Sequence, residues 1–129
     1  MLDNMFAKLH KRYAKNAITE SHIDDIVIEL IPRDKNFSYL EQGARNLCKA
    51  FIIALLSNRE HAPTTLARFQ DFCGLGYLED DRLDLMRDYF KEHSHECKRL
   101  ADCAITTSDD DALRILSVFY AHLANAKAE

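Results

Sequence analysis

The run AFIIALL at residues 50–56 is the longest apolar stretch in the chain, and it constrains the fold more than any other feature. A helix that is apolar on every side must be covered all round, which is typical of the central helix of a bundle. Seven residues cannot cross a bilayer, because a membrane-spanning helix needs about 20. The run therefore indicates a buried helix of a globular domain.

The sequence around this run predicts where the central helix begins and ends. SYLE, residues 38–41, has the pattern of a capping box, with Ser38 as the N-cap and Glu41 reaching back to it. Apolar residues then follow at helical spacing, at Leu40, Ala44, Leu47, Phe51, Ala54 and Leu55, with Cys48, Ile52 and Leu56 beside them. The pattern predicts a central helix over about residues 39–57, where Phe51→Ala would cost about 3–5 kcal/mol.

Turn-forming residues are scarce, which favours helices throughout. Three glycines and two prolines among 129 residues are too few for an all-β protein of many short strands. The sequence therefore predicts an all-α fold, a compact bundle of five or six helices forming a single domain over residues 1–129. The other expected helices cover about residues 2–15, 21–31, 65–73, 79–104 and 108–123.

The segment SHIDDIVIELIP at residues 21–32 is ambiguous. Its β-branched residues would suit a strand. Its apolar residues also fall at helical spacing, and Ser21 could be an N-cap with Asp24 at the capping-box position. A single strand would have no partner in a helical chain, so we expect a helix that ends before Pro32.

The stretch KEHSHECKRLADC at residues 91–103 gathers residue types that bind metals. On a helix, His93 and Cys97 lie four residues apart within a regular apolar seam. His95 lies about 200° round the helix from His93, and Cys103 points beside the seam. The stretch therefore supplies two ligands at most.

A structural zinc site needs four ligands. Cys48 could be a third and His61 or His122 a fourth, if the fold brought them together. Free cysteines are commonly small hydrophobic residues of a core. We therefore favour packing for His93 and Cys97, and keep a metal- or thiol-based sensor as the alternative.

Catalytic motifs are weak in this sequence. Cys73 is at the end of an expected helix, where the helix dipole raises a thiol's pKa and makes it a poor nucleophile. LEDDRLDLMRD, residues 78–88, lacks the alternating acidic positions and the glycine of an EF-hand loop. We expect no enzymatic activity and no cofactor.

Charge is unevenly distributed, with a net charge of −4. Residues 1–15 hold four basic residues and one acidic residue, a net charge of +3, whereas residues 79–129 carry a net charge of −5. These regions could attract each other within one chain or between two, although solvated helix faces are the simpler interpretation. Residues 64–90 resemble a helix-turn-helix only faintly, and the second helix begins with acids that phosphate would repel. A nucleic-acid-binding regulator is therefore a further alternative.

The function expected by elimination is protein binding. The N-terminal segment has no apolar core of a secretory signal, so we expect a cytoplasmic protein that does not associate with membranes. An adaptor, a secretion-type chaperone, an immunity protein and an inhibitor of a regulator all fit this pattern. Aromatic residues enriched at interfaces suggest Tyr77, Tyr89 and Tyr120 as partner-binding residues, with Phe90 and Phe119 in the core. Homodimerisation is also expected, because two apolar stripes near the C-terminus exceed what one small bundle covers.

Overall fold

The computed structural model describes residues 1–14, 20–33, 39–57, 65–74 and 109–127. All the regular elements in these ranges are helices: α1 (Leu2–Ala14), α2 (Glu20–Leu30), α3 (Tyr39–Ser57), α4 (Leu66–Phe72) and α7 (Asp109–Asn125). The expected all-α bundle is therefore confirmed. No helix in the described ranges combines the length and the apolar character that crossing a membrane requires. The helix expected over residues 79–104 lies outside the described residues.

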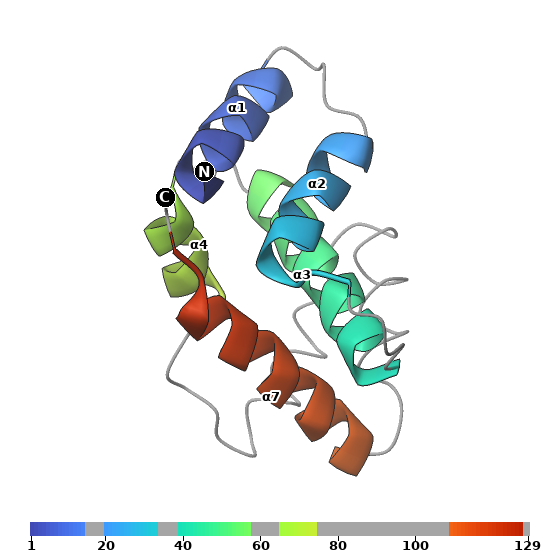
Figure 1. Ribbon diagram of the computed structural model, residues 1–129. Coiled ribbons are helices and arrows are strands. Elements are labelled where there is room, and N and C mark those ends of the chain that lie inside the picture. Colours follow the sequence, from blue (N-terminus) through green and yellow to red (C-terminus); the bar gives the residue numbers. More distant parts are fainter. Residues whose placement is uncertain (15–19, 34–38, 58–64, 75–108, 128–129) are drawn as a thin grey trace.

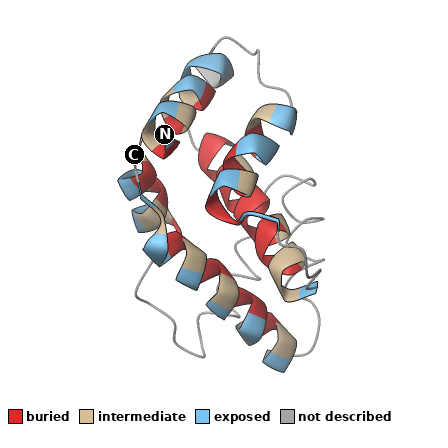
Figure 2. Cartoon of the chain, in the orientation of Figure 1, coloured by how far each residue is buried: buried red, intermediate tan, exposed pale blue. Residues whose placement is uncertain are grey.

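Helix α3 lies at the centre of the bundle, as predicted. It contacts α2, α4 and α7, while α1 packs on α2 and α4 (Figure 1). Residues 50–56 are buried except for Ile53, which is half-buried. Figure 2 shows buried residues along α3 and along the inner sides of the surrounding helices. The helix that is apolar on every side is thus the one that the others cover.

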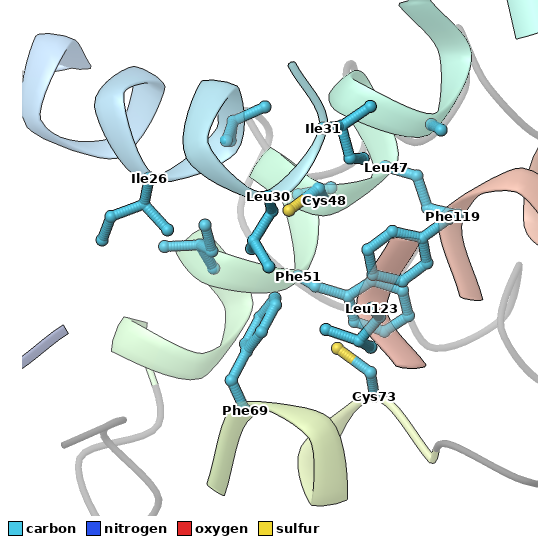
Figure 3. Packing of buried hydrophobic residues seen from close by; sticks show 14 of the residues in the cluster. Ile26, Leu30, Ile31, Leu47, Cys48, Phe51, Phe69, Cys73, Phe119 and Leu123 are labelled. Carbon is cyan, nitrogen blue, oxygen red and sulfur yellow. The ribbon is translucent and has the colours of Figure 1, made fainter. Parts of the chain in front are cut away.

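Aromatic side chains connect α3 to α4 and α7. The ring of Phe51 stacks on that of Phe119, with centroids 5.5 Å apart, and meets Phe72 edge-on at 6.3 Å. Phe6 of α1 packs against Phe69 of α4 at 5.2 Å. Figure 3 shows Phe51, Phe69 and Phe119 among the buried side chains of the core. Phe119 is buried, which confirms its predicted place in the core.

Helix α2 settles the ambiguity between helix and strand. Its buried residues Ile23, Ile26, Val27 and Leu30 form the predicted stripe. The helix begins at Glu20, so Ser21 lies within its first turn, and the prediction that Ser21 is the N-cap was wrong. It ends at Leu30, before Pro32, as expected from the restriction that proline places on the preceding residue.

Two side chains cap the N-terminal end of the short helix α4, and a glycine follows its C-terminal end. Thr65 is its N-cap and accepts a hydrogen bond from Arg68 N at 3.2 Å. Asp3 Oδ1, from the first turn of α1, accepts a second bond from Leu66 N at 2.7 Å. Gly74 follows the helix with φ of 72°, a conformation that favours glycine. The local sequence pattern predicts a cap at Thr64 or Thr65 and a stop at Gly74, and the structure confirms both, with Thr65 as the cap.

Helices α3 and α7 approach closely at Gly43. A Cβ atom at this position would lie 2.8 Å from Ile115 Cδ1 and 3.1 Å from Ile115 Cγ1. Both residues are buried. The absence of a side chain at residue 43 therefore leaves the space that Ile115 of α7 occupies against α3.

Candidate interaction surface

Most of the residues predicted to carry function lie outside the described residues. Tyr77, Tyr89, His93 and Cys97 all belong to the range 75–108. The partner-binding role of the two tyrosines and the sensor role of His93 and Cys97 therefore stay predictions.

Tyr120 lies inside the bundle, with 7% of its surface exposed. Its hydroxyl donates a hydrogen bond to Cys73 O at 2.6 Å. A second bond joins the same two helices, from Gln70 Nε2 of α4 to Leu123 O of α7 at 2.8 Å. Tyr120 thus connects α7 to the end of α4, and its predicted contact with a partner remains untested.

Two thiols lie within the apolar core. Cys48 of α3 and Cys73 after α4 are both buried, and Figure 3 shows them among aliphatic and aromatic side chains. Burial raises the pKa of both thiols above the ordinary value, and the neighbouring Cys48 raises the pKa of Cys73 further. The raised pKa of Cys73 agrees in direction with the prediction of a weak nucleophile, although its main cause is burial and not the helix dipole.

The proposed metal ligands do not come together within the described ranges. Cys48 belongs to the core, His122 is half-buried on α7, and His61 lies outside the described residues. No group of three or more histidine, cysteine, aspartate or glutamate residues that could hold a metal ion occurs in the part of the chain that the structure describes.

Two basic residues of α3 are almost fully buried and hold α2 in place. Arg45 donates from Nε to Ile31 O and from Nη2 to Pro32 O, both at 3.0 Å. Lys49 forms an ion pair with the exposed Asp24 of α2, with Nζ and Oδ1 2.9 Å apart. Arg45 therefore holds the C-terminal end of α2 against α3. Lys49 holds the exposed side of α2 through Asp24.

The outward sides of α1 and α2 carry opposite charge. Among the described side chains, the exposed charged residues of α1 are all basic and those of α2 are all acidic. We call the set the charged face; its members are Lys8, Lys11 and Arg12 of α1 and Asp24, Asp25 and Glu29 of α2. In Figure 2 the exposed sides of both helices are visible from the same direction. Because α1 packs on α2, the two rows lie on neighbouring helices.

Sequence reasoning found half of this face. The basic row followed from the charge of residues 1–15, but the acidic row was not singled out. The sequence pattern nevertheless indicates an acidic row, because Asp24, Asp25 and Glu29 occupy the positions between the apolar residues of α2. What the sequence did not give was the packing of α1 beside α2, which makes the two rows neighbours.

No family model, curated protein or solved structure matches this chain. The case for a function therefore rests on the chemistry and placement of its own residues.

Proposed function

We propose that the protein is a non-enzymatic module that binds another protein through the charged face of α1 and α2. The observation that carries this proposal is the separation of exposed charge by sign, with a basic row on one helix and an acidic row on the next. The proposal covers an adaptor, a secretion-type chaperone, an immunity protein and an inhibitor of a regulator, each of which acts by binding another protein.

Helix stability accounts for part of the basic row, because Lys11 and Arg12 lie in the last turn of α1, where the helix dipole favours cations, but it does not account for the rest. Lys8 and Arg12 are four residues apart on α1, as are Asp25 and Glu29 on α2. Like charges at this spacing destabilise a helix by about 0.2–0.5 kcal/mol per pair. Glu29 also lies in the last turn of α2, where the helix dipole disfavours an acid. The rows are better explained by what they attract from outside.

A partner that binds two adjacent rows of opposite charge must match their arrangement as well as their net charge. The rows attract a partner whose own charges have the reverse arrangement, and they repel one that docks in the wrong orientation. Such rows speed association and fix orientation, and salt screens them. A partner bound here should therefore be lost as ionic strength rises.

The test is affinity capture from the native cells, followed by identification of the bound protein. Wild-type protein is compared with Lys8→Gln/Arg12→Gln, which removes two charges from the basic row. The matched control is Arg68→Gln/Lys127→Gln, which removes the same charge from exposed positions elsewhere. The proposal predicts one stoichiometric partner that the first variant loses and the control retains. Equal capture by wild type and both variants would contradict it.

A further inference from the structure

We draw no further inference here: the strongest candidate, the surface patch that Tyr39 and Asp111 form where α3 and α7 begin, is an exposed ring beside an acidic helix N-terminus, and nothing in the structure shows what covers it.

Discussion

Arg45→Met should destabilise the bundle by releasing the end of α2 from α3. Arg45 is 7% exposed, and its guanidinium donates to Ile31 O and Pro32 O at 3.0 Å. Its contacts with Gln42 Oε1 at 3.4 Å and Glu41 Oε2 at 3.5 Å are at the edge of hydrogen-bonding distance and contribute little. The two bonds to carbonyl oxygens therefore decide the effect.

The magnitude follows from what the substitution leaves behind. Methionine keeps most of the aliphatic stem and has a similar helix propensity, so packing and local helix stability change little. Ile31 is fully buried, so its carbonyl loses a donor that water cannot replace, at about 1–3 kcal/mol. Pro32 is exposed, so water can bond its carbonyl instead at small cost. We expect a loss of about 2 kcal/mol.

Urea denaturation followed by circular dichroism measures this loss. Arg45→Lys keeps the charge without the forked geometry, so it should fall between wild type and Arg45→Met. Arg68→Met is the matched control, because Arg68 is exposed on α4. Its stability should change by less than about 0.5 kcal/mol. If Arg45→Met is as stable as wild type, or Arg68→Met loses as much, the guanidinium does not anchor α2.

Four further effects are expected. Gly43→Ala should lose about 1–2 kcal/mol through its clash with Ile115, despite the better helix propensity of alanine, and adding Ile115→Val should recover part of that loss in a double-mutant cycle. Tyr120→Phe should lose about 1 kcal/mol in urea denaturation, because the bond to Cys73 O disappears, and an unchanged midpoint would refute that role. The thiols of Cys48 and Cys73 should resist alkylation at pH 8 until the chain unfolds, as peptide mapping can show. Because their pKa is raised in the folded state, unfolding releases protons above about pH 8.5, so stability should fall as pH rises further, with a shallower slope in Cys48→Ala.

The parts of the fold that the sequence predicted are those that depend on one helix at a time. Residues 50–56 are apolar on every side, so their central position followed without any knowledge of neighbours. The stripe of Ile23, Ile26, Val27 and Leu30 outweighed the β propensity of the same residues, because burial of one helical side stabilises more than propensity costs. Thr65 and Gly74 followed from the local chemistry of helix ends.

The features of the fold that the sequence could not predict depend on contacts between two separate helices. Asp3 caps α4 from a position 63 residues earlier in the chain, and no local pattern relates the two. Arg45 is buried on α3, and its role could not be predicted without the carbonyl end of α2 beside it. The charged face has the same origin, since the rows of α1 and α2 become neighbours only when the helices pack together.

The measurement that tests the central claim most directly is capture of a partner from the native cells at low and at high salt. Wild type should retain one stoichiometric partner at low salt and lose it at high salt, and Lys8→Gln/Arg12→Gln should not retain it at either. Equal capture by wild type and Lys8→Gln/Arg12→Gln would show that the charged face is not the surface that binds.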